Sequence, residues 1–227
     1  MQQTEEVAVD MEEYYRRRAK GYDEEIYQTR ADPARQEELQ SIADVSKEAL
    51  KARRVLDVAC GTGHWTEIVS ETAQSIVGTD IAKEMLEIAG KKQFKCPVSF
   101  CRADAFNLPF KNYSFNGGMA DFWFSHIPRE KIESFLEDFH RLLKSGSLVL
   151  MADNVYIAGI GGEFVKKEGD ANTYKRRKLG DGSQHLVLKN YFSRDELAEI
   201  FAKHARGFGR KNVFYGKYYW HLFYELK

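Results

Sequence analysis

Short runs of apolar and β-favouring residues alternate with helical segments along the middle of the chain. The strand-like runs cover residues 53–60, 75–80, 98–104, 115–122 and 147–154. Helical patterns fill residues 66–72, 82–90 and 129–144 between them. Strands that alternate with helices, without an internal repeat, predict an α/β fold with a doubly wound, mostly parallel sheet.

The N-terminal flank has a helical pattern of its own. Tyr14, Arg18, Tyr22 and Ile26 recur at four-residue spacing and predict a helix over residues 11–31. Asp32-Pro33 ends that helix, and residues 33–51 predict a second one that leads into the first strand.

After residue 154 the regular alternation stops. Residues 155–192 contain glycine turns, and residues 185–192 alternate as in a strand with one apolar face. Ser193-Arg-Asp-Glu196 is a capping box that opens a helix to residue 205. Two further runs, 211–215 and 218–226, predict an antiparallel hairpin that completes a seven-stranded sheet.

Composition narrows the class of protein. The 227 residues fit a single domain, 1–227, and Lys plus Arg equals Asp plus Glu at 34 each, so a nucleic-acid partner is not expected. Three cysteines do not form a disulfide framework, and we predict reduced thiols in a cytoplasmic protein. No apolar run reaches membrane-spanning length, and the start of the chain is acidic and polar, unlike a signal peptide. We also predict no metal site.

The segment from Asp57 to Gly63 carries the first chemical signal. Gly61 and Gly63 follow a strand, where open α/β sheets bind ligands, and glycine allows a ligand to approach the backbone. A dinucleotide fingerprint needs a third small residue where Thr66 stands, and a P-loop needs Lys after the last glycine. Asp57 inside the strand favours a cationic ligand over a pyrophosphate.

Asp57-Val-Ala-Cys-Gly61-Thr-Gly63 resembles the first motif of class I S-adenosylmethionine-dependent methyltransferases, with Ala59 in place of the first glycine. The resemblance covers roughly residues 14–154 and implies a Rossmann-like methyltransferase fold that binds S-adenosylmethionine. It implies an N-terminal helical lid at 1–50 and a cofactor-binding core at 51–154. Beyond the resemblance, we interpret residues 155–192 as an insertion that covers the acceptor and residues 193–227 as a C-terminal helix and hairpin. The cofactor-binding residues that it implies are Tyr14, Tyr22, Asp57, Ala59, Gly61, Gly63, Asp80, Ile81, Met85, Asp104, Ala105, Phe106 and Ala120.

Two of these acids also have simpler interpretations. Asp80 lies about 20 residues beyond the glycine turn, where a carboxylate accepts both ribose hydroxyls, but it could instead cap the following helix. In the family, the acid at Asp104 and the backbone after it read the adenine amino group. Asp104 could otherwise be a turn residue.

His126 is the candidate general base, because it follows the fourth strand beside the expected acceptor and imidazole titrates near neutral pH. A histidine bonded to a neighbouring loop is the alternative, and a carboxylate acceptor needs no base. The residues predicted to bind the acceptor are Phe122, His126, Asn154, Tyr174, Arg176, His185, Lys189 and Tyr191. The basic run from Lys175 to Lys178 could equally be solvated surface.

We therefore predict a methyltransferase that moves a methyl group from S-adenosylmethionine to an oxygen or nitrogen of a small-molecule acceptor. Two alternatives remain open at this stage. One is an RNA or protein methyltransferase, supported only by the basic run, and the other is a non-catalytic regulator that binds the cofactor. The identity of the acceptor and the oligomeric state are left open by the sequence.

Overall fold

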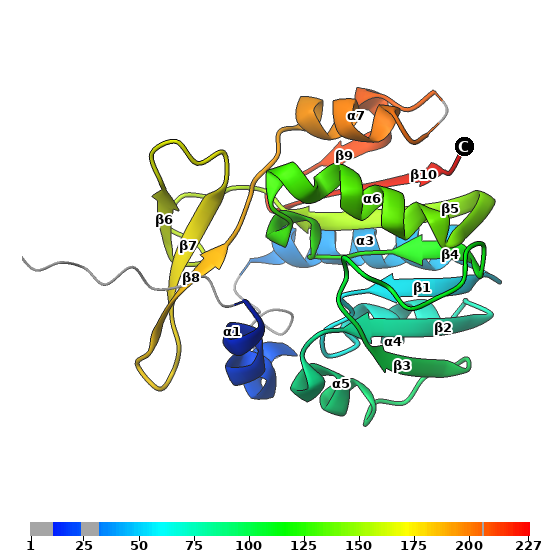
Figure 1. The fold of residues 1–227 in the computed structure, drawn as a ribbon, viewed down its shortest axis with the longest axis horizontal. Coiled ribbons are helices and arrows are strands. Elements are labelled where there is room, and N and C mark those ends of the chain that lie inside the picture. The colour runs from blue at the N-terminus through cyan, green and yellow to red at the C-terminus, as the bar shows by residue number, and fades with distance from the viewer. Residues whose placement is uncertain (1–10, 24–31, 206) are drawn as a thin grey trace, which may run out of the picture.

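The computed structural model describes residues 11–23, 32–205 and 207–227, and its main feature is a seven-stranded sheet (Figure 1). The strand order is β3-β2-β1-β4-β5-β10-β9. The first five strands of the chain pair in parallel, and β10 is antiparallel to both of its neighbours. The bounds are β1 Arg54–Val58, β2 Ser75–Asp80, β3 Val98–Arg102, β4 Phe115–Met119, β5 Leu143–Asn154, β9 Val213–Tyr215 and β10 Tyr219–Glu225.

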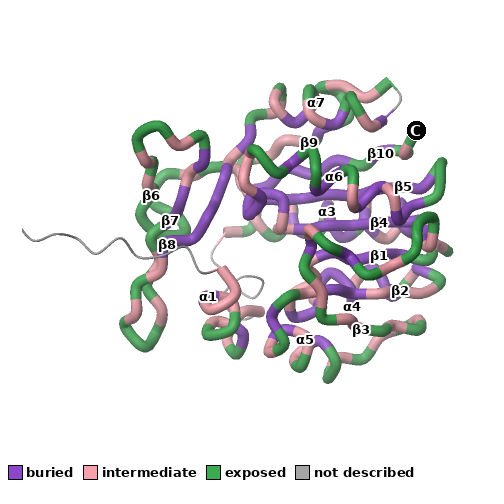
Figure 2. The backbone as a smooth tube through the Cα atoms, in the orientation of Figure 1, coloured by how far each residue is buried: buried purple, intermediate pink, exposed green. Residues whose placement is uncertain are grey.

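Helices cover both faces of this sheet. Side chains alternate along a strand, so Val55 of β1 packs with the layer of α3 and α4, while Leu56 packs with the layer of α6 and α7. The central strands are almost wholly buried between the layers (Figure 2). The helices are α3 Pro33–Ala49, α4 His64–Ser70, α5 Lys83–Ala89, α6 Ile132–Arg141 and α7 Arg194–Ala202, with short 3-10 turns η2 Phe124–His126, η3 Arg129–Lys131 and η4 Arg210–Asn212.

The insertion forms a separate three-stranded antiparallel sheet in the order β6-β7-β8. Its strands are β6 Glu163–Lys166, β7 Thr173–Lys178 and β8 Gln184–Leu188. The carboxyl ends of the parallel strands point toward this small sheet and toward the N-terminal helix α1, Met11–Arg18 (Figure 1). Open α/β sheets bind ligands at the carboxyl ends of their strands, so the site is expected at this edge of the main sheet.

The predicted doubly wound fold is confirmed, with the C-terminal hairpin and the capping box at Ser193. The prediction of one continuous helix over residues 11–31 is wrong, because α1 ends at Arg18 and a 3-10 turn, η1 Ala19–Gly21, follows. The low helix propensity of glycine accounts for a break at Gly21. The remainder of that predicted helix, residues 24–31 with Ile26, lies outside the described residues.

The insertion differs most from expectation. Only one strand was predicted there, and its residues were expected to show one apolar face, but Leu186, Val187 and Leu188 are all buried. Leu186 and Leu188 pack with Tyr174 and Met11, so β8 is covered on the side that meets α1. The basic run lies in β7. Arg176 is exposed, but Lys175 is only 1% exposed. The alternative that the run is solvated surface therefore holds for only part of it.

Candidate functional site

A cavity of about 380 Å³ lies at the carboxyl ends of the parallel strands. The turns that follow β1, β2, β3 and β4 form its floor, and α1 with the end of β8 covers it. The residues that line it are Met11, Glu12, Tyr15, Tyr22, Asp57, Ala59, Cys60, Gly61, Thr62, His64, Trp65, Asp80, Ile81, Met85, Ala103, Asp104, Ala105, Phe106, Asp121, Phe122, Trp123, His126, Pro128 and Leu188.

The glycine turn after β1 bends sharply into α4. Ala59, Gly61 and Gly63 have φ angles of 55°, 55° and 75°, a region that favours glycine. Ala59 therefore adopts a backbone conformation suited to the glycine that the family motif has at this position. At Gly63 a side chain is excluded as well, because a Cβ atom would lie 3.1 Å from Cβ of Ala89.

Two buried carboxylates line the cavity, near the carboxyl ends of the adjacent strands β1 and β4. Asp57 accepts a hydrogen bond of 2.5 Å from Oγ1 of Thr66, and burial raises its pKa to about 7. Asp121 is 7% exposed, and neither of its carboxylate oxygens makes a hydrogen bond of normal geometry to the described residues, although the backbone of Ala152 favours the charged form. Burial is the larger effect and raises the pKa of Asp121 well above its ordinary value. A buried acid with so little compensation is costly, so the site is suited to a cationic ligand.

Asp80 contacts both the glycine turn and the residue that precedes α5. Its Oδ1 accepts from the backbone N of Ala82 at 2.8 Å, beside the start of α5, and its Oδ2 accepts from the N of Gly61 at 2.9 Å. Because it also lines the cavity, the carboxylate holds the glycine turn and faces the ligand space at once. Burial raises its pKa to about 6. Asp104 is exposed to the cavity and accepts from the N of Phe106 at 2.9 Å.

His126 lies in η2, at the β4 side of the cavity, and is 6% exposed. Its Nδ1 is 2.7 Å from the carbonyl oxygen of Leu188, and its Nε2 is 2.8 Å from the hydroxyl of Tyr15. Burial, followed by the charges of Lys189 and Arg177, lowers its pKa well below the ordinary value. The imidazole is therefore neutral at physiological pH.

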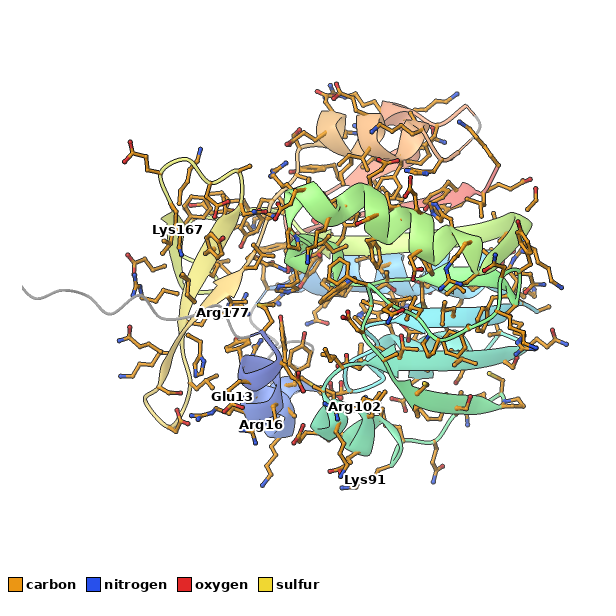
Figure 3. All side chains as sticks on the ribbon, in the orientation of Figure 1. Glu13, Arg16, Lys91, Arg102, Lys167 and Arg177 are labelled. Atoms are coloured by element: carbon orange, nitrogen blue, oxygen red, sulfur yellow. The ribbon has the colours of Figure 1, made fainter. Side chains whose placement is uncertain are left out.

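The N-terminal segment contacts the core on both sides of the cavity. Tyr15 reaches His126, and Asp23 accepts hydrogen bonds from Oγ1 of Thr62 in the glycine turn and from Nζ of Lys92. Arg102 of β3 pairs with Glu12 at 2.9 Å. Figure 3 shows Arg102 at the junction between the main sheet and α1, and Arg177 between β7 and α1.

Most of the predicted cofactor-binding residues come together. Ten line the cavity: Tyr22, Asp57, Ala59, Gly61, Asp80, Ile81, Met85, Asp104, Ala105 and Phe106. Gly63 and Ala120 are not among the lining residues. Tyr14 lies behind the cavity wall, where its hydroxyl accepts from Arg177 and its ring packs near His185.

Few of the predicted acceptor-binding residues reach the cavity. Phe122 and His126 line it, whereas the structure places outside its lining Asn154, Tyr174, Arg176, His185, Lys189 and Tyr191. Arg176 pairs with Glu163 on the exposed side of the small sheet.

Lys189 is buried beneath η2 rather than facing the cavity. It donates to Asp153 at 3.0 Å and to Oγ of Ser125 at 2.6 Å. Asn190 donates to the carbonyl of Ile127 at 2.9 Å. The end of β8 therefore fixes the turn that carries His126.

Sequence analysis missed several lining residues, above all Tyr15, Trp65, Asp121 and Trp123. Asp121 lies near the carboxyl end of the fourth strand, as the other acids lie near the ends of theirs, so the same pattern could have identified it. Tyr15 differs from Tyr14 by one position of a helix, and only the rotation of α1 on the core decides which of the two faces the cavity.

Comparison with known proteins defines the class. The family described as "Methyltransferase domain" matches residues 55–146. Demethylmenaquinone methyltransferase of Staphylococcus epidermidis is 35% identical over 104 residues, which cover 44% of this chain and 42% of that protein. The chain thus spans less than half of the length of that relative.

Two further matches extend over most of the chain. Uncharacterized protein MJ1252 of Methanocaldococcus jannaschii is 30% identical over 205 residues, covering 85% of this chain and 74% of that protein. The DhpI–SAM–HEP complex has a similar fold, with a TM-score of 0.71 and 24% identity over 93% of this chain and 94% of that chain. The chain belongs to the methyltransferase family, and the predicted family and class I methyltransferase fold are confirmed. In the described ranges no helix is both long and apolar enough to cross a membrane.

Proposed function

We propose that this protein transfers the methyl group of S-adenosylmethionine to an oxygen or nitrogen of a small-molecule acceptor. The observation that carries the proposal is the pair of buried carboxylates, Asp57 and Asp121, in the cavity that the glycine turn also lines. S-adenosylmethionine carries a sulfonium and an ammonium and no phosphate. The cofactor can therefore place a positive charge beside these two carboxylates and compensate their negative charge.

The order of the strands supports an assignment of each reactant to one end of the cavity. Asp80 and Asp104 follow β2 and β3, on one side of β1, and we assign the nucleoside to them. Trp123 and His126 follow β4, on the other side of β1, and we assign the acceptor to that end. The residues between these ends hold the reactants in line and exclude water, which is most of what a displacement reaction requires.

The dimensions of the cavity support a small acceptor. Its volume of about 380 Å³ lies near the lower end of the roughly 300–1,000 Å³ typical of small-molecule sites. The staphylococcal relative is named for demethylmenaquinone and the DhpI complex contains SAM and HEP, which also supports a small acceptor here. All three cysteines are free thiols, in keeping with a cytoplasmic location.

The direct test is turnover of S-adenosylmethionine labelled at the methyl group, with a panel of phenols, alcohols, carboxylic acids and amines. We expect transfer to at least one class, and calorimetric binding of S-adenosylmethionine and S-adenosylhomocysteine but not of NAD. Tight cofactor binding with no transfer to any member would favour a regulator instead. Salt-dependent retention of RNA on a filter would favour the nucleic-acid alternative.

A matched pair of variants tests the carboxylate assignment. Asp121→Asn removes the charge from the cavity, and a hydrogen bond to a charged group contributes about 1.5–3 kcal/mol, so S-adenosylmethionine should bind about 10- to 100-fold more weakly. Asp195→Asn removes an exposed carboxylate that pairs with Arg210 far from the cavity. Its affinity should equal that of the wild type, and equal loss in both variants would contradict the assignment.

A further inference from the structure

A directed hydrogen-bond chain runs from β8 through His126 to Tyr15. The carbonyl oxygen of Leu188 can only accept, so Nδ1 of His126 must carry the hydrogen in their 2.7 Å contact. In a neutral imidazole Nε2 then has a lone pair and no hydrogen. The 2.8 Å contact at Nε2 must therefore be a hydrogen bond donated by the hydroxyl of Tyr15.

This direction decides what Tyr15 can offer to a ligand. Its only hydrogen is used by His126, and its hydroxyl has no other hydrogen-bond partner among the residues described. Tyr15 lines the cavity on the same side as His126 and Trp123. The Tyr15 oxygen therefore presents lone pairs, and no hydrogen, to whatever occupies that end of the cavity.

We infer that Tyr15 is a catalytic residue whose oxygen receives the proton of the acceptor, and that the atom to be methylated carries a hydrogen, as in a hydroxyl or an amine. This inference rests on the proposed function and names the class of acceptor for it. An anionic oxygen, such as a carboxylate, would meet the lone pairs of Tyr15 and be repelled. His126 takes a positioning and relay role, since Nε2 is already bonded to Tyr15.

The proton and electron balance is complete without any further reactant. The acceptor oxygen or nitrogen forms a bond to the methyl carbon, the carbon–sulfur bond breaks, and sulfur keeps the electron pair. The acceptor proton passes to the Tyr15 oxygen as the original Tyr15 proton passes to Nε2 of His126. The imidazolium then returns its proton to solvent when the products leave.

The surroundings hold this chain in one arrangement. Asn190 ties the end of β8 to η2, because its backbone N donates to the carbonyl of Ser125 at 2.7 Å and its side chain donates to the carbonyl of Ile127 at 2.9 Å. The charged groups that act on His126 are Lys189 after β8, Arg177 of β7 and Arg18 of α1, all cations. They oppose a stable imidazolium, so protonated His126 is a transient acid that is quickly discharged.

The molecule contains a second tyrosine–histidine pair that serves as a control. The hydroxyl of Tyr224 lies 2.6 Å from Nε2 of His140, between β10 and α6, and neither residue lines the cavity. Tyr224→Phe removes the same kind of buried hydrogen bond as Tyr15→Phe. Any general cost of losing such a bond should therefore appear in both variants.

The first measurement needs no acceptor. Nitrogen-15 NMR of the wild-type protein with bound S-adenosylhomocysteine should show His126 as the neutral tautomer with hydrogen on Nδ1. The Nε2 resonance should shift in Tyr15→Phe and not in Tyr224→Phe. A hydrogen found on Nε2 would reverse the chain and overturn the inference.

The second measurement uses the labelled cofactor with phenols of graded pKa, together with alcohols, amines and carboxylic acids. Tyr15→Phe should lower kcat by about 100-fold or more with hydroxyl and amine acceptors, the effect expected for loss of general base catalysis. Its remaining rate with phenols should rise with pH as the phenol ionises in solution. Tyr224→Phe should show neither effect, and a purely structural role of Tyr15 would not create the new pH dependence.

The outcomes separate the inference from the proposed function. No transfer by the wild type to any member of the panel would refute the proposed function and the role of Tyr15 with it. Wild-type transfer that Tyr15→Phe retains in full, or transfer to carboxylic acids alone, would refute only the role of Tyr15. A Tyr15→Phe variant that binds S-adenosylmethionine weakly but keeps its kcat would show a role in closing the site rather than in catalysis.

Discussion

At the scale of single residues, the acids of the cavity are expected to make cofactor binding depend on pH. Burial raises the pKa of Asp57 to about 7 and that of Asp80 to about 6. A bound cation favours the ionised form of each acid, so binding must release protons wherever the free site is still protonated. Affinity for S-adenosylmethionine should therefore rise with pH through this window.

Calorimetry from about pH 5 to about pH 8.5, in buffers of different ionisation enthalpy, measures both the affinity and the released protons. Asp57→Asn should bind more weakly and lose the upper part of the pH dependence. The free energy of unfolding of the ligand-free protein should instead fall as pH rises. An acid with a raised pKa favours folding at pH values below its unfolded pKa, and that contribution is lost as pH rises through the folded pKa.

Asp80 needs a test that separates its two contacts. Asp80→Ala removes the acceptor for Gly61 and Ala82, so the free energy of unfolding should fall by about 1 kcal/mol, as for loss of a helix cap. If Asp80 also binds the ribose, the wild type should prefer S-adenosylhomocysteine to its 2′-deoxy analogue, and Asp80→Ala should lose that preference. An undiminished preference in the variant would leave Asp80 as a purely structural residue.

At the scale of elements, β8 is attached to the core by a buried ion pair. Lys189 and Asp153 are 3% and 0% exposed, and their 3.0 Å contact joins the small sheet to β5. Removing one partner of a buried pair leaves an uncompensated charge, so Lys189→Met should destabilise the protein by about 3–5 kcal/mol. Arg176→Met breaks the exposed pair with Glu163 in the same small sheet and should cost about 0–1 kcal/mol. Urea unfolding of both variants checks the contrast.

The secondary-structure elements also show which parts of the fold could be predicted from the sequence. The strands that form the main sheet were predictable because each has a local apolar run and a turn at its end. The small sheet was not, because β7 is a polar strand that pairs between β6 and β8, and β6 is a four-residue strand that pairs with β7. Lys175 illustrates the difficulty, since its buried Nζ donates to the carbonyls of Ile160 and Gly162, partners that no local pattern reveals.

The residues of the candidate site also divide into those that could be predicted from the sequence and those that could not. Asp57, Asp80 and Asp104 each lie at or near the carboxyl end of a predicted strand, and the parallel sheet brings such positions together at one edge. The covering elements were not predictable in this way. Whether Tyr14 or Tyr15 faces the cavity, and whether Lys189 points into it or beneath it, depends on how α1 and β8 dock on the core.

At the scale of the whole molecule, the cover formed by the N-terminal segment implies a gating motion. Met11, Glu12, Tyr15 and Tyr22 all line the cavity, so we expect this segment to move when the cofactor enters or leaves. Polar contacts hold the segment at both ends, Tyr15 with His126 and Asp23 with Thr62 and Lys92. Such a lid is expected to open on a slower timescale than the local motions of the core.

Asp23→Asn tests this gate without altering the floor of the cavity. The variant weakens the contacts to Thr62 and Lys92, so S-adenosylhomocysteine should dissociate faster, by about tenfold for a loss of about 1.4 kcal/mol, while its association rate changes little. Lys83→Gln removes an exposed pair with Glu87 on α5 and serves as the control. Hydrogen exchange should slow at residues 11–23 when the cofactor binds the wild type, and less so in Asp23→Asn. Exchange that is equally fast with and without cofactor would mean that the segment does not close on the ligand, and the cavity would then have to fill by another route.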